Sequence, residues 1–186
     1  VRKIAEENGL ATAEKKDSTG ICFIGERNFR KFLMNYIPAK EGDIKTYDGR
    51  TLGRHYGLMY YTIGQRKGLD IGGQAGDAGR WFVIEKDMKN NILYVAHGEE
   101  DRLYSKGLLT GKINFIPSVP DKKEFCCNAK FRYRQDEQKV FVKLKDDGSA
   151  EVEFAERQRA ITEGQYCVFY DDEKCLGGGV IEKALF

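Results

Sequence analysis

The spacing of apolar residues predicts a short helix at the start of the chain. The apolar side chains between Val1 and Asn8 share one helical face. Gly9 follows, and glycine suits the left-handed backbone conformation that ends many helices. Residues 11–13 are then predicted to form a brief strand that leads toward a pair of lysines.

A second helix is predicted from Arg27 to Tyr36 by a stripe of apolar residues. The stripe follows the i, i+3, i+4, i+7 spacing of one helical face, which is typical of core packing. Its members are Phe29, Phe32, Leu33 and Tyr36. Pro38 ends the helix, because the residue before a proline is restricted away from helical backbone angles.

Turn residues divide the middle of the chain into two predicted hairpins. The dipeptide Asp48-Gly49, within the extended region from Glu41 to Gly57, is a strong hairpin signal. The β-rich runs Arg80 to Lys86 and Ile92 to His97 predict the second hairpin, with Asn90-Asn91 in its turn. These elements indicate a small sheet in the centre of the chain.

The segment between the two hairpins leaves more than one interpretation open. Thr62 can cap a short helix that ends at Gly68. The glycine-rich run from Gly68 to Gly76 precedes a strand rather than a helix, so it does not match a phosphate-binding loop. It is either a plain surface loop or a loop that lies close to an RNA backbone. His55 has no evident partner in the sequence, which favours a structural or exposed role over a catalytic one.

The last part of the chain shows only strand patterns. Six runs of strand-forming residues are separated by turns such as Asp146-Asp147-Gly148 and Asp171-Asp172. The runs are Leu108 to Phe115, Glu124 to Tyr133, Gln138 to Leu144, Ala150 to Phe154, Gln165 to Tyr170 and Cys175 to Glu182. Short strands at even spacing predict a closed barrel or a sandwich. The polar segment from Gly98 to Tyr104 marks the domain boundary before them.

Composition narrows the class of protein. The net charge of +2 is too small to indicate nucleic-acid binding by itself. The five cysteines form no Cys-x-x-Cys pair and the two histidines are remote from them, so neither a zinc site nor a disulfide framework is expected. A reducing cytoplasmic setting fits best, and no membrane span or signal peptide is evident. Because the chain does not begin with Met, we expect a fragment of a longer protein.

The remaining cysteines and a basic cluster carry weaker signals. Cys126 and Cys127 should face opposite sides of a strand, and Cys167 and Cys175 are expected to pack in the interior. Positive charge concentrates in the hairpin from Lys122 to Lys145. Within it Lys130, Arg132 and Arg134 would share one strand face, either as a solvated surface or as a stripe that contacts phosphates. Tyr133 would point the other way, or stack on a base if the strand ends there.

One stretch places a cysteine between two glycines and just before a helical pattern. Cys22 lies between Gly20 and Gly25, which allow the backbone to turn. A nearby helix N-terminus lowers a thiol pKa and favours the nucleophilic thiolate. The competing interpretation is that Cys22 is a small buried apolar residue beside Ile21 and Phe23.

This stretch resembles the signature of the bacterial-type tRNA-specific 2-thiouridylases, which place sulfur on the wobble uridine of certain tRNAs. The similarity covers nearly the whole chain and includes several long motifs. They are Lys15-Lys16-Asp17-Ser18-Thr19-Gly20-Ile21-Cys22-Phe23-Ile24-Gly25, Tyr60-Tyr61-Thr62-Ile63-Gly64-Gln65-Arg66-Lys67-Gly68-Leu69, Lys130-Phe131-Arg132-Tyr133-Arg134 and Leu176-Gly177-Gly178-Gly179-Val180-Ile181. One departure is Asp70, where the family usually has glycine. Its carboxylate would repel phosphate, so no RNA contact is expected there.

The resemblance implies an α+β fold with a small mixed central domain followed by a C-terminal antiparallel β-barrel. Residues 1–25 would be the tail of an ATP-pyrophosphatase-type catalytic domain, residues 26–103 the central domain and residues 104–186 a tRNA-binding barrel. ATP with Mg²⁺ would be bound by the N-terminal domain that this chain lacks, and this chain would bind no cofactor or metal itself. We therefore expect the chain alone to be inactive.

The resemblance also implies roles for particular residues. Cys22 would carry the persulfide whose sulfur goes to C2 of the adenylated uridine, with an upstream cysteine completing the transfer. Arg132, Tyr133 and Gln165 would contact tRNA. The partners would be tRNA and a sulfur-donor protein, either a cysteine desulfurase or a relay carrier, with no membrane partner.

Two other functions remain compatible with the sequence. One is a non-catalytic RNA-binding β-barrel module of translation-factor type, in which Cys22 is only structural. The other is a stand-alone sulfur carrier that binds no RNA. Persulfide formation on Cys22 separates the enzyme from the first alternative, and charge reversal at Arg132 and Arg134 tests the second.

Overall fold

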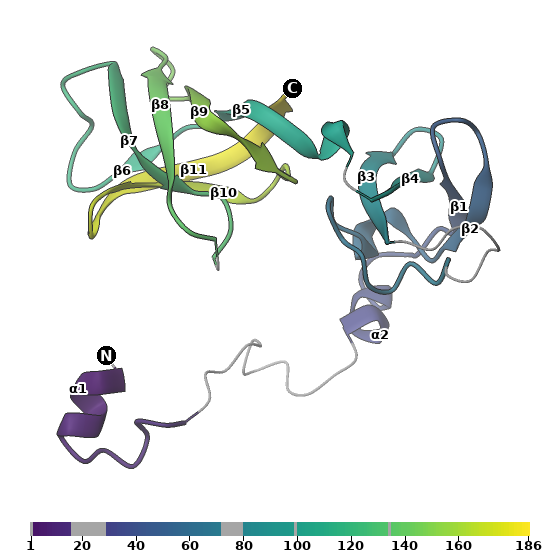
Figure 1. Cartoon of the computed structure of the whole chain (residues 1–186), viewed down its shortest axis with the longest axis horizontal. Coiled ribbons are helices and arrows are strands. Elements are labelled where there is room, and N and C mark those ends of the chain that lie inside the picture. The colour runs from purple at the N-terminus through teal and green to yellow at the C-terminus, as the bar shows by residue number, and fades with distance from the viewer. Residues whose placement is uncertain (1, 16–28, 72–79, 99, 134) are drawn as a thin grey trace. The chain divides into compact units, whose positions relative to one another are not determined.

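The computed structural model describes residues 2–15, 29–71, 80–98, 100–133 and 135–186. The chain divides into two units, residues 1–39 and 40–186. Among the described residues the structure is mostly β, with two short α-helices beside strands β1 to β11 (Figure 1). The expected small mixed sheet and antiparallel barrel are both present, whereas the α+β label overstates the helix content. The domain boundaries expected from the sequence stay a prediction.

The first unit contains both α-helices. Helix α1 spans Arg2–Glu7 and helix α2 spans Phe29–Met34. The predicted strand at residues 11–13 is wrong, because this segment forms turns in which the Ala13 N–H donates to the Leu10 carbonyl at 3.0 Å. The predicted core role of the α2 stripe fails at Tyr36, whose side chain is 71% exposed and contacts the Phe32 ring at a centroid distance of 5.2 Å.

The second unit begins with a four-stranded sheet in the order β2-β1-β4-β3. Its strands are β1 (Gly42–Lys45), β2 (Thr51–His55), β3 (Trp81–Asp87) and β4 (Ile92–His97). Both predicted hairpins are confirmed, since β1 pairs with β2 and β3 pairs with β4 in antiparallel fashion. The two hairpins join through a parallel pairing of β1 with β4, which makes the sheet mixed.

A bulge in β3 lets two adjacent side chains of this strand pack in different hydrophobic cores. The register with β4 shifts between Val83 and Glu85, so the alternation of side chains is interrupted there. As a result the adjacent residues Val83 and Ile84 are both buried. Val83 packs in the core of the small sheet, while Ile84 packs with Leu103 and Ala160 in a separate cluster next to the barrel.

The rest of the second unit is a closed antiparallel barrel. Its strands are β5 (Tyr104–Thr110), β6 (Asn114–Phe115), β7 (Glu124–Lys130), β8 (Gln138–Leu144), β9 (Ala150–Arg159), β10 (Tyr166–Asp171) and β11 (Lys174–Leu185). The order β10-β7-β8-β9-β5-β11 closes because β10 also pairs with β11 (Figure 1). The single run predicted from Leu108 to Phe115 is divided into β5 and β6. Short 3-10 turns at Leu58–Tyr60 and Asp101–Leu103 complete the unit.

The glycines of β11 let two other strands approach closely. A Cβ atom on Gly177 would lie 2.1 Å from the carbonyl oxygen of Asn114, and Gly177 has a φ of 125°. A Cβ atom on Gly178 would lie 2.6 Å from the carbonyl oxygen of Cys167. Any side chain at these positions would push β6 or β10 away, which explains the glycine run physically.

Candidate functional site

The candidate site is a hollow where strands β7 and β10 separate. Their antiparallel pairing ends with Lys130 opposite Val168. Beyond this pair β7 ends and its chain turns away, while β10 continues back toward Tyr166. The resulting hollow encloses about 380 Å³. Its lining includes Lys130, Arg132, Tyr133, Gln165, Tyr166 and Tyr170.

The hollow brings together three residues that sequence analysis singled out. Arg132 and Tyr133 follow the end of β7, and Gln165 immediately precedes β10. The separation of the two strands therefore places these three residues around one hollow. Tyr133 is 95% exposed, which leaves both faces of its ring open to a ligand. A backbone hydrogen bond to β11 positions Gln165, since its carbonyl accepts from the Ile181 N–H at 2.7 Å. Its amide side chain is exposed at the rim.

The shared strand face expected for the basic residues is wrong. Strand β7 ends at Lys130, so Arg132 lies in a bend rather than on the strand. Arg134 lies outside the described residues. Lys130 instead lies near Glu137, at 3.5 Å between Nζ and a carboxylate oxygen, and its Nζ is 5.5 Å from the centre of the Tyr170 ring. Two cations therefore reach the hollow from different elements.

Arg132 also connects the barrel to the small sheet. Its Nη2 donates to the carbonyl of Ala160 at 2.8 Å, to the carbonyl of Ile63 at 3.1 Å and to Oγ1 of Thr162 at 3.4 Å. Partial burial lowers the pKa of Arg132, and the charge of Arg159 lowers it further. Arginine nevertheless remains protonated. Because all three contacts use Nη2 and a guanidinium has five N–H groups, Nε and Nη1 can still face a phosphate.

The loop that meets Arg132 contains the glycine of the Thr62-Ile63-Gly64-Gln65 motif. A Cβ atom on Gly64 would lie 2.6 Å from Cβ of Ala160, and Gly64 has a φ of 80°. The predicted helix after Thr62 is wrong, because this loop instead pairs with β3. The Gly64 N–H donates to the Val83 carbonyl at 2.7 Å, and the Val83 N–H donates to the Gln65 carbonyl at 3.0 Å. The motif therefore has a structural role next to the hollow.

Two tyrosines of the hollow were not singled out from the sequence. Cys167 and Phe169 on β10 are fully buried, so the alternating residues Tyr166, Val168 and Tyr170 lie on the outer face. Tyr166 is 61% exposed. The alternation of side chains along β10 could have been inferred from the sequence. The place where β7 and β10 separate, which makes Tyr166 part of the hollow, depends on how the two strands pair.

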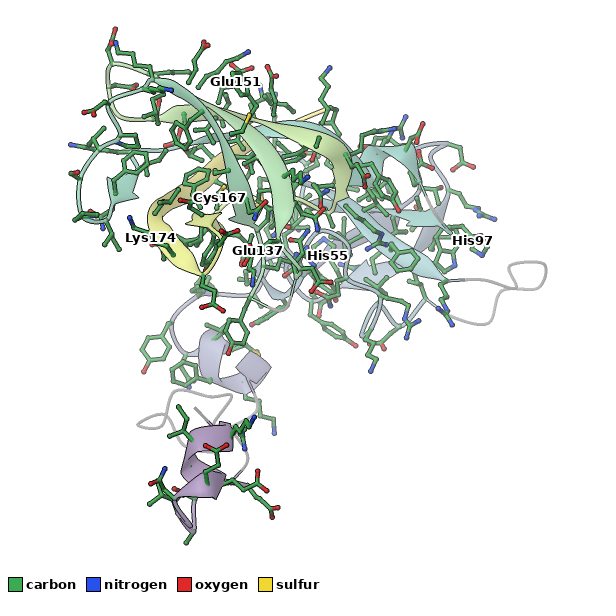
Figure 2. The ribbon with its side chains drawn as sticks, turned by 60° about the vertical axis from the view of Figure 1, so that its left-hand side comes forward. His55, His97, Glu137, Glu151, Cys167 and Lys174 are labelled. Atoms are coloured by element: carbon green, nitrogen blue, oxygen red, sulfur yellow. The ribbon has the colours of Figure 1, made fainter. Side chains whose placement is uncertain are left out.

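Cys22, the residue expected to carry sulfur, lies outside the described residues. The four described cysteines are free. Burial is the main cause that raises the pKa of Cys127 to about 12, and burial also raises the pKa of Cys167, which lies in the barrel core (Figure 2). Cys126 is exposed while Cys127 is partly buried, as expected for opposite strand faces. Cys175 is exposed, so its expected packing role is wrong.

The histidine without an evident partner is part of the small sheet. His55 is fully buried, and its Nδ1 accepts a hydrogen bond from the Gly57 N–H at 3.1 Å. Nε2 therefore carries the proton and donates to the Asn91 carbonyl at 3.0 Å. This arrangement confirms a structural role for His55.

Metal-binding clusters and membrane-spanning helices are both absent from the described residues. Within the residues that the structure describes, no group of three or more His, Cys, Asp or Glu side chains could hold a metal ion. In the same part of the chain, no helix has the length and apolar character needed to cross a bilayer.

Three family models match consecutive parts of the chain. Residues 1–26 match a tRNA methyl transferase HUP domain, and residues 30–97 match a tRNA methyl transferase PRC-barrel domain. Residues 105–181 match an aminomethyltransferase beta-barrel domain, which includes all the named residues of the hollow. Together the three matches cover nearly the whole chain.

Three curated relatives that share one name are similar to this chain over nearly its whole length. A tRNA-specific 2-thiouridylase MnmA of Listeria innocua is 58% identical over 183 residues, which are 98% of this chain and 48% of that protein. The proteins of the same name from Streptococcus thermophilus and Exiguobacterium sibiricum are 59% and 57% identical, over 99% of this chain and 50% and 49% of their own lengths. The chain thus spans about half the length of the curated relatives it matches.

Proposed function

The chain belongs to the family of the tRNA-specific 2-thiouridylases, and we propose that it forms the sulfur-carrying and tRNA-holding part of such an enzyme. The observation that carries the proposal is the hollow between β7 and β10. It gathers Arg132, Tyr133 and Gln165, the three residues expected to contact tRNA, from segments about thirty residues apart. A cation, an exposed aromatic ring and an amide are the groups that recognise phosphate, base face and base edge.

In this proposal Cys22 carries the sulfur. A persulfide on Cys22 would give its outer sulfur to C2 of the wobble uridine, and the oxygen at C2 would leave with the adenylate. The thiol of an upstream cysteine would take the bond to the Cys22 sulfur, so the two cysteines would end as a disulfide that a thiol reductant resolves. The raised thiol pKa values of Cys127 and Cys167 make those residues poor substitutes, because the thiolate is the reactive form.

ATP would activate the uridine by adenylating its C2 oxygen. No described segment of this chain places a glycine-rich loop between a strand and a helix, which is the arrangement that cradles phosphates. We therefore assign ATP and its Mg²⁺ to the half of the relatives that this chain does not align with. The boundaries at residues 25/26 and 103/104 remain part of this proposal.

The remaining partners follow from the same chemistry. Loading Cys22 requires a donor of persulfide sulfur, either a cysteine desulfurase or a relay protein. Free cysteines and a tRNA substrate are compatible with the reducing cytoplasm. The alternative of a non-catalytic RNA-binding barrel explains the hollow but assigns no role to a persulfide on Cys22.

Mass spectrometry tests the sulfur role directly. The chain would be incubated with a cysteine desulfurase and cysteine, then mapped by peptide mass with its Cys22→Ser variant as control. We expect one added sulfur on Cys22, whereas the exposed Cys126 and Cys175 serve as internal controls for indiscriminate modification. Sulfur on those two residues but not on Cys22 would contradict the assignment.

A further inference from the structure

The outer face of β10 presents an aromatic surface beside the hollow. Tyr166, Val168 and Tyr170 alternate with the buried Cys167 and Phe169, so their side chains lie on one face. Tyr166 is 61% exposed, although tyrosine is large and largely apolar. An exposed ring at the edge of a hollow is a suitable stacking platform for a planar ligand.

Because β7 separates from β10 after Lys130, no residue of β7 pairs with Tyr166. If β7 continued in register with β10, Arg132 would lie opposite Tyr166. Instead the chain bends after Lys130, and the guanidinium of Arg132 turns to the carbonyls of Ala160 and Ile63. The hollow therefore exists because Arg132 is held away from β10, and Tyr166 remains at its edge.

The cations around the hollow define which ligand fits beside the ring. Lys130 lies opposite Val168, and its Nζ lies near the ring of Tyr170, on the same outer face as Tyr166. Arg132 retains N–H groups that its protein contacts do not use. A ligand with a planar ring and an adjacent negative charge would satisfy both the tyrosine and the cations.

From this arrangement we infer that the hollow is a subsite for one unpaired nucleotide of RNA, with its base stacked on Tyr166 and its phosphate near Lys130. The inference rests on the proposed function, because it takes the tRNA to be the source of that nucleotide. A base in a duplex is already stacked on both faces, so only a looped-out or single-stranded nucleotide can use the ring. The volume of about 380 Å³ is within the range of small-molecule sites.

Binding of a fluorescently labelled tRNA and of a short single-stranded RNA to the 186-residue chain tests the inference. We expect Tyr166→Ala to weaken binding of both RNAs about tenfold, as loss of one base stack does. Tyr166→Phe keeps the ring and should bind like the unaltered chain. The matched control is Phe186→Ala, which removes an aromatic ring that is 67% exposed but lies outside the hollow. Thermal melting of each variant checks that the barrel is intact.

The salt dependence separates stacking from phosphate contact. Tyr166→Ala should leave the slope of log K against log salt unchanged, because a tyrosine releases no counterion. Lys130→Ala should make the slope less steep by about 1, as expected for the loss of one phosphate contact. If the unaltered chain binds tRNA and folded Tyr166→Ala binds it equally well, the nucleotide subsite is wrong while the proposed function stands. Failure of the unaltered chain to bind either RNA would overturn both.

Discussion

The guanidinium of Arg132, which lines the hollow between β7 and β10, donates to the backbone carbonyl of Ala160 at 2.8 Å, and Ala160 packs with Ile84 of the small sheet. Ala160 has a φ of 56°, and its N–H donates to the carbonyl of Leu103 at 2.6 Å. The same arginine donates to the carbonyl of Ile63, in the loop that pairs with β3 of the small sheet. A single side chain thus contributes both to stability and to the proposed RNA surface.

Arg132→Ala is expected to lower the free energy of unfolding by about 2 kcal/mol, because hydrogen bonds from a charged donor to two carbonyls are lost. Urea denaturation of the chain measures this change. Arg132→Lys should recover only part of the loss, since one ammonium cannot reproduce the planar fork of a guanidinium. Equal stability of Arg132→Ala and the unaltered chain would show that the three contacts contribute nothing.

Arg132→Ala is also expected to weaken tRNA binding. The slope of log K against log salt should become less steep by about 1, because one phosphate contact is lost. Arg157→Ala is a matched control, because Nη2 of Arg157 also donates to two backbone carbonyls, those of Asp101 and Tyr104, but does not line the hollow. The slope of log K against log salt should change for Arg132→Ala and stay constant for Arg157→Ala. Identical slopes for both variants would remove Arg132 from the phosphate contacts.

The contacts of Arg132 show why the site was only partly predictable. The residue type and its motif were evident, but its acceptors at Ile63 and Ala160 are 69 and 28 residues away in sequence. Local propensity carries no information about such pairs. The same limit explains the wrong helix after Thr62, because pairing of the loop with Val83 overrides the capping signal.

The fold was predictable where short-range chemistry decides it. The Asp48-Gly49 turn brings Thr46 and Arg50 together across the first hairpin, with the Thr46 N–H donating to the Arg50 carbonyl at 2.9 Å. Runs of strand-forming residues separated by turn residues likewise marked most barrel strands. The exposure of Cys175 was missed, because it lies beside the β10–β11 turn and a bulge near Tyr170 shifts the register there.

Gly64→Ala is expected to destabilise the chain by about 3 kcal/mol. The new Cβ would lie 2.6 Å from Cβ of Ala160, and the backbone φ of 80° is strained for alanine. Gly49→Ala provides the control, since Gly49 has a similar φ of 90° but open space around it, and should cost only about 1 kcal/mol. The difference between the two variants in urea denaturation isolates the steric clash. If both lose the same free energy, the close approach of Gly64 to Ala160 is wrong.

The thiol of Cys127 is expected to make the barrel less stable at high pH. Burial and the nearby Cys126 and Asp171 raise the pKa of Cys127 from 9.0 to about 12, so the folded state keeps its proton after the unfolded state has lost it. Its contribution is therefore fully present below pH 9 and is lost as pH rises toward 12.

Lysines and tyrosines titrate in the same range, so the test compares variants rather than single curves. Cys127→Ala should show a flatter decline in the free energy of unfolding between pH 9 and pH 11, whereas Cys126→Ala, which removes an exposed thiol, should follow the unaltered chain more closely. Parallel curves for Cys127→Ala and the unaltered chain would mean that the Cys127 thiol ionises as easily in the folded barrel as in the unfolded chain.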